Sequence, residues 1–594
     1  MLHRIALSLL LSLLLALLSF TGAQAANDAL STVAERSGFQ KTGRYDEVIA
    51  LCGQFQRAYP KFVRCLEFGR TPEGRPMLAL VVSRTGVLQP EMAQLRNLPV
   101  VLIQGGIHAG EIDGKDAGFL ALREALDSHA LPDVLSKQVI LFVPVFNVDG
   151  HERFGRWNRP NQRGPEEMGW RTTAQNFNLN RDYVKADAPE MQAMLRLVQT
   201  WDPVATIDLH VTDGAKFEHD VSVQVEPVNA GDASLRRAGL AFRSAVMADL
   251  ARAGSLPLPF YPSFVTEDDP SSGFIDDVFL PRFSTGYFQL RNRLSMLIET
   301  HSWKDYPRRV QITRTTIDSI LSQIALHGAE WRKTALAADI LATQMAGQPV
   351  PLSYAASAKV RTIDFRGYAY TRTVSDISGA LMTSYDESKP QIWQLPLRDE
   401  VLVAQSAVAP LAGYIVPPAY AAMVGQKLAL HGVSFRTLWA TTAGAKVETF
   451  RAAKANFEAR PFESHQRLAL EGEWRPEARE IRNGSLFVPI NQAKARLVMA
   501  ILEPQAPDSL LAWGFFNNAF EKKESMEDYV AEEVARAQLA ADPSLAERFR
   551  KKLADEPAFA KNASERLEFF ARRHSSWDER FQLYPVLRTS MTPK

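Results

Sequence analysis

The spacing His-x-x-Glu occurs twice in this chain, at His108–Glu111 and at His327–Glu330. A histidine and a carboxylate three residues apart can bind one metal ion, but in a chain of 594 residues the spacing alone says little. His108 follows the apolar run 98–107, and Glu111 opens the next helical pattern. His327 and Glu330 lie inside a long helical pattern that offers no further ligand. We therefore expect a metal site at the first pair and none at the second.

A further histidine also lies at the end of an apolar run that predicts a strand. His210 lies at the end of another apolar run, 204–211. Two histidines and one glutamate from different strand ends leave the fourth position of a zinc ion open for water, which is the arrangement of a catalytic zinc. The sequence therefore predicts one Zn²⁺ per chain, bound by His108, Glu111 and His210.

A second carboxylate completes the expected chemistry. Glu299 comes near the end of the apolar run 294–300 and directly follows Met-Leu-Ile. A surface charge is the plain interpretation of such a residue, but the apolar residues before it indicate a buried carboxylate. Near a metal-bound water, a carboxylate can take a proton and pass it to a leaving amine. Glu299 is the candidate general base.

The elements that must position these residues alternate between strands and helices from about residue 45 to residue 335. Continuous apolar strands with helices between them indicate an α/β fold with a mostly parallel sheet covered by helices. Ligands in such folds bind beyond the carboxyl ends of the strands. The predicted strands are 77–83, 98–107, 138–148, 204–211 and 294–300, and the predicted helices are 45–59, 112–127, 189–201 and 308–345.

Composition excludes several classes of protein. The chain is 46% hydrophobic, which excludes a disordered or collagen-like protein. Lys and Arg number 68 and Asp and Glu 67, a balance with no sign of a nucleic-acid footprint. Two cysteines exclude a zinc site made of four thiolates. Cys52 and Cys65 form either a disulfide or two buried thiols.

The order of the motifs resembles that of the zinc carboxypeptidases of the carboxypeptidase A type. The resemblance covers roughly residues 40–335, and it implies the zinc ligands and the general base named above. The motifs are, in chain order, HAGE (108–111), NVDG (147–150), RWNRPNQR (156–163), NLNRDY (178–183), DLH (208–210) and IET (298–300).

The resemblance also implies residues that hold the substrate. Asn180 and Arg181 match the family's Asn-Arg pair, which binds the C-terminal carboxylate of the substrate, a task that suits a bidentate guanidinium. Family members use an upstream arginine to stabilise the oxyanion of the scissile carbonyl. Arg159 is the best positional match for it, with Arg156 and Arg163 as competitors.

Two positions depart from the family pattern. The digestive enzymes have arginine before the ligand glutamate, whereas this chain has Gly110. Their mobile active-site tyrosine corresponds to position 277, which is Asp here, and Tyr287 is the nearest tyrosine that can replace it. No residue of a specificity pocket is recognisable.

The first 25 residues predict a secretory signal peptide. His3 and Arg4 precede an apolar run, 5–20, and Ala23-Gln24-Ala25 forms the cleavage site. The run is shorter than a membrane span, so no membrane anchor is expected after cleavage. The pattern fits a bacterial protein that is periplasmic or secreted.

The predicted division is a signal peptide (1–25), a catalytic domain (40–340), a β-rich domain (352–510) and a mainly helical segment (511–594), with 347–351 as a linker. The function expected is hydrolysis of the C-terminal peptide bond of peptides that have a free carboxylate. The first alternative is a zinc amidase or deacylase acting on cell-wall peptides or acyl-amino acids. The second is a binding protein without catalysis, which the complete ligand set and Glu299 disfavour.

Overall fold

The computed structural model describes residues 29–127 and 132–593. The predicted signal peptide, 1–25, lies outside these residues. In the described parts of the chain, no helix combines the length and the apolar character that crossing a membrane requires.

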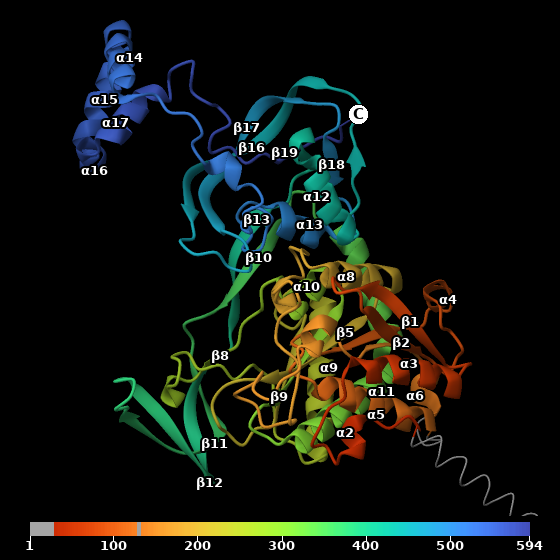
Figure 1. Cartoon of the computed structure of the whole chain (residues 1–594). Coiled ribbons are helices and arrows are strands. Elements are labelled where there is room, and N and C mark those ends of the chain that lie inside the picture. Colours follow the sequence, from red (N-terminus) through yellow and green to blue (C-terminus); the bar gives the residue numbers. More distant parts are fainter. Residues whose placement is uncertain (1–28, 128–131, 594) are drawn as a thin grey trace, which may run out of the picture.

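An eight-stranded sheet forms the core of the first region (Figure 1). Its four middle strands, β4, β3, β5 and β9, are parallel, and antiparallel strands flank them on both sides. The expectation of a mostly parallel sheet covered by helices is confirmed. In spatial order the strands are β1 (Val63–Arg70), β2 (Pro76–Val82), β4 (Val139–Val143), β3 (Val100–Gly105), β5 (Ala205–Thr212), β9 (Leu294–His301), β6 (Val221–Glu226) and β7 (Pro257–Leu258).

Helices cover both faces of this sheet. Figure 1 shows α8 and α10 on one side and α3, α5, α9 and α11 on the other, and α11 packs against α5 and α9. The helices of this region are α2 (Val33–Arg36), α3 (Tyr45–Ala58), α4 (Pro90–Leu95), α5 (Asp113–Asp127), α6 (Pro132–Ser136), α7 (Val148–Glu152), α8 (Pro189–Trp201), α9 (Ala233–Arg252), α10 (Ser284–Leu290) and α11 (Tyr306–Ala342), with 3₁₀ turns η1 (Leu179–Arg181) and η2 (Pro270–Ser272).

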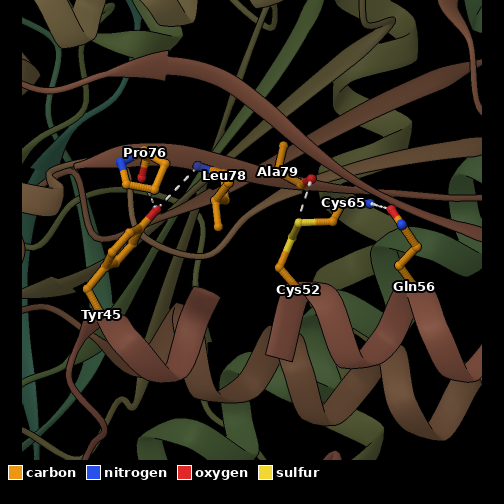
Figure 2. The surroundings of a disulfide bond; sticks show 7 residues. All are labelled: Tyr45, Cys52, Gln56, Cys65, Pro76, Leu78 and Ala79. Atoms are coloured by element: carbon orange, nitrogen blue, oxygen red, sulfur yellow. Dashed lines mark hydrogen bonds between the residues drawn. A yellow bond between two sulfur atoms is a disulfide. The ribbon is translucent and has the colours of Figure 1, made fainter. Parts of the chain in front are cut away.

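The two cysteines join α3 to the edge of the sheet. Cys52 on α3 and Cys65 on β1 form a disulfide (Figure 2), which decides between the two alternatives. Beside it, Tyr45 Oη donates to the carbonyl of Pro76 at 2.7 Å and accepts the N–H of Leu78 at 3.2 Å. A covalent bond and these hydrogen bonds therefore fix α3 on β1 and β2.

Two apolar runs behave differently from their prediction. The run 138–148 is a strand only to Val143, because Pro144 has no N–H for the ladder, and α7 begins at Val148. The stretch 495–502, expected as part of a β-rich region, is helix α13. It is a run of eight residues in which only Arg496 is polar, and so short an apolar run cannot be distinguished from a buried strand by its pattern.

The chain continues into smaller sheets. Within the predicted linker 347–351, Pro349 begins strand β10, which pairs with β13. β11 and β12 form a long hairpin that also pairs with β8. These strands are β8 (Phe274–Ile275), β10 (Pro349–Ala356), β11 (Arg361–Val374), β12 (Leu381–Arg398) and β13 (Val401–Val408).

A six-stranded sheet and a group of helices complete the described chain, and Figure 1 shows α14–α17 standing apart from that sheet. The strands, in spatial order, are β15 (Arg436–Thr437), β18 (Leu486–Pro489), β14 (Gly413–Val416), β19 (Leu587–Thr589), β16 (Thr442–Phe457) and β17 (Leu468–Ile481). The helices are α12 (Pro418–Leu430), α13 (Ala495–Leu502), η3 (Asn517–Phe520), α14 (Asp528–Ala541), α15 (Pro543–Asp555), α16 (Pro557–Lys561) and α17 (Ala563–Ala571). The domain boundaries near 340–352 and 510 stay predictions.

Candidate metal centre and substrate cleft

Three neighbouring parallel strands bring the predicted residues together. His108 and Glu111 lie in the loop between β3 and α5, His210 lies on β5, and Glu299 lies opposite His210 in register on β9. The loop leaves β3 through Gly106, whose φ of +62° is a left-handed conformation that glycine adopts without strain. Strand order and one glycine turn therefore place four residues from distant parts of the chain at one sheet edge.

The histidine and glutamate side chains form a compact buried cluster. Nδ1 of His108 lies 2.9 Å from Glu111 Oε1, and Nδ1 of His210 lies 2.9 Å from Glu111 Oε2. One donor atom from each of the three residues lies within 4.8 Å of the others, and all three side chains are buried. This donor set, two imidazoles and one carboxylate, is one that Zn²⁺ prefers.

In each imidazole, the nitrogen that faces away from Glu111, Nε2, lies against a polar side chain. Nε2 of His108 donates to Asn178 Oδ1 at 3.2 Å, and Nε2 of His210 lies 3.1 Å from Asp208 Oδ1. Partners of this kind fix the ring orientation of metal-binding histidines. Both Nδ1 atoms consequently face Glu111, and the residues present fit a zinc ion. The sequence interpretation did not identify Asn178 and Asp208, although both belong to its motifs NLNRDY and DLH.

The protonation states of the three clustered side chains favour the binding of a metal cation. Burial lowers the pKa of His108 to about 4, which leaves it neutral, as a ligand must be. Burial disfavours ionised Glu111, but His108 and Arg159 outweigh burial and hold its pKa well below the usual value. Burial also lowers the pKa of His210, yet Asp208 and Glu299 outweigh it and raise that pKa. Carboxylates that attract a proton to His210 attract a metal ion in the same way.

Glu299 lies beside the cluster rather than in it. Its Oε1 is 4.0 Å from His210 Nδ1, and burial raises its pKa to about 8. Its Oε2 is buried and has no hydrogen-bond partner among the described residues. In its ionised form, a buried carboxylate with an oxygen that has no partner, next to a metal cluster, is placed to accept a proton from water.

Two arginines contact Glu111, and only one of them was predicted. Arg159 Nη2 lies 3.1 Å from Glu111 Oε1 and 3.1 Å from Asp213 Oδ1, and Arg159 is buried. Arg171 Nη1 lies 3.6 Å from Glu111 Oε1, and 35% of its side chain is exposed. Arg171 therefore has donors free to face a substrate, whereas Arg159 is held by protein groups. The signal that could have revealed Arg171 is its position between the NVDG and NLNRDY motifs.

The two competing arginines lie elsewhere. Arg156 packs over the ring of Trp157, and Arg163 Nη2 pairs with Glu387 Oε1 at 2.6 Å. Neither is in ion-pair contact with Glu111.

The Asn180–Arg181 pair forms a short turn next to His108. Asn180 is buried, and its N–H donates to Asn178 Oδ1 at 3.1 Å. The guanidinium of Arg181 lies 4.3 Å from the ring centre of Phe283, and within the described chain no carboxylate is within ion-pair distance of it. Burial, followed by the positive charge of Arg171, lowers the pKa of Arg181 to about 10. Arg181 is a charged group without a counter-ion, which suits the capture of an incoming carboxylate.

The assignment of Tyr287 to substrate binding is wrong. Tyr287 has no exposed surface, and its hydroxyl donates to Nδ1 of His431, which follows α12, at 2.9 Å. Tyr261, which the sequence interpretation did not identify, lies much closer to the cluster. It is half-buried, accepts the hydroxyl of Thr212 at 3.1 Å, and has its pKa raised by burial and by Glu299. Proximity in sequence to Glu299 was misleading, because α10 turns Tyr287 into the core.

The departure at Gly110 has a steric cause. A Cβ atom at this position would lie 2.6 Å from Arg159 Cγ and 2.7 Å from the carbonyl oxygen of Gly169. No side chain fits at position 110, so the arginine of the family pattern has no room here.

Comparison with known proteins agrees with this site. The family model described as zinc carboxypeptidase matches residues 48–246. Carboxypeptidase 2 of Trichophyton tonsurans is 29% identical over 153 residues, 25% of each chain. Carboxypeptidase B of Helicoverpa zea is 28% identical over 133 residues, 21% of this chain and 29% of its own. The matched segment spans about a quarter of the length of these relatives. The similarity to the zinc carboxypeptidase family covers residues 48–246 of the 594.

Other likenesses are weaker or differ in kind. The inactive metallocarboxypeptidase ECM14 of Saccharomyces cerevisiae is 32% identical over 124 residues, 19% of this chain and 28% of its own. Among solved structures, carboxypeptidase A from Helicoverpa armigera is 16% identical, with a TM-score of 0.36 over 50% of this chain and 75% of its own. The metallo-carboxypeptidase from Burkholderia cenocepacia is 18% identical, with a TM-score of 0.35 over 47% of this chain and 69% of its own.

Proposed function

We propose that this protein is a zinc-dependent carboxypeptidase that removes the last residue from peptides with a free C-terminal carboxylate. The observation that carries the proposal is the convergence of His108, Glu111 and His210 beside Glu299, whose buried Oε2 has no partner. A binding protein needs no such oxygen, whereas hydrolysis needs a group that accepts a proton from water.

Each chain residue has a definite task in this reaction. Arg181 and Asn180 hold the substrate carboxylate, and Arg171 donates hydrogen bonds to the scissile carbonyl oxygen as it becomes negative. Zn²⁺, when bound, polarises that carbonyl and makes water more acidic. Glu299 takes the proton of the attacking water and transfers it to the leaving nitrogen. One water is consumed, the C–N bond breaks, and a shortened peptide and a free amino acid leave.

The direct test compares two peptides of one sequence, one ending in a free carboxylate and the other in an amide. The zinc-loaded protein is expected to release a single residue from the free peptide, which mass spectrometry detects, and to leave the amide intact. Equal cleavage of both would replace the proposal with the amidase alternative. Zinc binding with no cleavage of any peptide would favour the non-catalytic alternative.

Export is a separate proposal. The charged, apolar and Ala-x-Ala parts of residues 1–25 support secretion or delivery to the periplasm, with cleavage after Ala25. Amino-terminal sequencing of the protein recovered from a bacterial periplasm is expected to begin at Ala26.

A further inference from the structure

A tight turn of the six-stranded sheet reaches the substrate side of the metal site. Residues 458–467 join β16 to β17, two strands that Figure 1 shows in the sheet beyond α8 and α10. Within this connection, Phe462 and His465 exchange both backbone hydrogen bonds, at 2.8 and 3.0 Å. The tip of the turn is therefore Glu463-Ser464.

The conformation of the tip is unusual for its residues. Glu463 and Ser464 have φ values of +48° and +69°, both in the left-handed region. Two-residue turns of this shape favour Asn-Gly, since few other residues adopt positive φ without cost. A glutamate in this place disagrees with the local backbone preference, and such disagreements concentrate at functional sites.

The turn is fixed against the first region from both sides. The ring of Phe462 stacks on Trp513 at 5.9 Å, and Arg282 lies over both rings. On the other side, Nε2 of His465 lies 2.7 Å from Oδ2 of Asp187. These contacts set the position of Glu463 between them.

Glu463 meets the turn that carries the carboxylate-binding pair. Its Oε2 accepts the backbone N–H of Asn178 at 3.3 Å, and Asn178 in turn contacts His108 and Asn180. Glu463 also attracts the charge of Arg181 electrostatically, although no ion pair joins them. The carboxylate of Glu463 thus lies beside the turn on which Asn180 and Arg181 would hold the substrate carboxylate.

The other charged side chains near Glu463 have ion-pair partners or are already assigned to a part of the substrate. Arg282 binds Asp508, with Nη2 2.6 Å from Oδ1, and Arg181 and Arg171 are assigned to the carboxylate and the carbonyl of the substrate. Glu463 is partly exposed, and in the described parts of the chain no cation is within ion-pair distance of it. The carboxylate of Glu463 is therefore available to recognise a positively charged group of the substrate.

We propose that Glu463 is a specificity-determining residue that contacts the side chain of the substrate's last residue and favours peptides that end in lysine or arginine. The inference rests on the proposed function, since it needs a substrate carboxylate on Arg181. It gives the β-rich C-terminal region, whose task the sequence did not reveal, a part in substrate choice.

The test uses the full zinc-loaded chain and peptides that differ only in the last residue, arginine or leucine. We expect the wild type to prefer arginine, and Glu463→Gln to lower the arginine-to-leucine ratio of kcat/KM about tenfold, as loss of one charge-assisted contact does. Glu458→Gln is the matched control, because Glu458 is an exposed glutamate of the same connection and faces no part of the 178–181 turn in any contact. Its ratio should equal that of the wild type.

Two outcomes overturn the inference while leaving the proposed function intact. One is an unchanged ratio in Glu463→Gln. The other is an equal loss for both peptides, which would assign Glu463 to holding Asn178 in place. If no peptide is cleaved, the proposed function fails, and calorimetry of the same two peptides with wild type and Glu463→Gln still measures the preference. Equal affinities of the wild type for both peptides would then reject it.

Discussion

The pairs His108–Glu111 and His327–Glu330 share one spacing and differ in everything around it. His108 and Glu111 are buried, joined by His210, and held from behind by Asn178. His327 and Glu330 are exposed on α11, where the ring of His327 stacks on Trp331 at 5.6 Å. A metal site therefore depends on where the fold places the residues, since a third ligand must converge and neighbouring groups must orient the ligands.

The largest expected difference is in activity when each histidine is removed. His108→Ala should lower kcat/KM by a factor of at least about 1,000, because the metal contributes several kcal/mol to transition-state stabilisation. His327→Ala should change kcat/KM less than about twofold, since an exposed helix residue has little effect. Peptide hydrolysis measured on both variants checks this. Comparable losses in His108→Ala and His327→Ala would show that activity does not depend on the first pair alone.

Replacing Glu299 separates catalysis from metal binding within the buried site. Glu299→Gln should reduce kcat by about 10²–10⁴, the usual contribution of a general base. Its zinc content should equal that of the wild type, because Glu299 lies beside the cluster and is not one of its three members. Kinetics and metal analysis are made on the same preparation. A variant with full activity would remove Glu299 from the mechanism.

Substitution of Arg171 and of Arg159 separates the roles of the two cations that contact Glu111. Arg171→Ala should lower kcat by about 10²–10³, as loss of an oxyanion donor does, with the zinc content unchanged. Arg159→Ala should change the zinc affinity, because Arg159 is in ion-pair contact with the ligand carboxylate of Glu111. Competition with a chelator measures the zinc affinity. The opposite pattern, with zinc affinity altered only by Arg171→Ala, would return the oxyanion role to Arg159.

Removal of Arg181 tests how the substrate is held. Arg181→Ala should cost about 2–4 kcal/mol in kcat/KM, about 30- to 700-fold, for peptides with a free carboxylate. Arg156→Ala is the control, since Arg156 packs on Trp157 and forms no ion pair with Glu111. An Arg181→Ala enzyme that retains wild-type kcat/KM on such peptides would refute the carboxylate anchor.

The smallest effect on catalysis is expected at Tyr287. Tyr287→Phe removes the hydrogen bond to His431 and should lower the free energy of unfolding by about 1 kcal/mol. Its kcat/KM should stay within about twofold of the wild type, because the side chain is buried away from the cluster. Denaturant titration and peptide kinetics make the two measurements. A large loss of activity at unchanged stability would restore Tyr287 as a substrate contact.

The strands β2, β3, β4, β5 and β9 and the metal cluster could be predicted from sequence because they depend on local patterns, whereas β1, β6 and β7 were not predicted. Apolar runs mark β3, β5 and β9, and parallel strands bring their carboxyl ends to one edge. Helix α8 has the predicted bounds, with Pro189 at its first position.

The remaining parts depend on contacts between distant segments, which local patterns do not contain. Arg171 and Tyr261 reach the site only through the folding of irregular loops, and Glu463 comes from a different sheet altogether. Helix α13 is a short apolar run with Arg496 as its one polar residue, and such a run cannot be distinguished from a buried strand by its pattern. Tyr287 was misplaced because sequence distance from Glu299 says nothing about the direction of α10.

Zinc stoichiometry shows directly whether the metal depends on the pair His108–Glu111 and not on His327–Glu330. Metal analysis of the purified wild type, His108→Ala and His327→Ala, each dialysed against the same zinc concentration, compares the two pairs without reference to any substrate. We expect one zinc per chain in the wild type and in His327→Ala, and a loss of this zinc in His108→Ala. Retention of a full equivalent by His108→Ala, or its loss from His327→Ala, would contradict it.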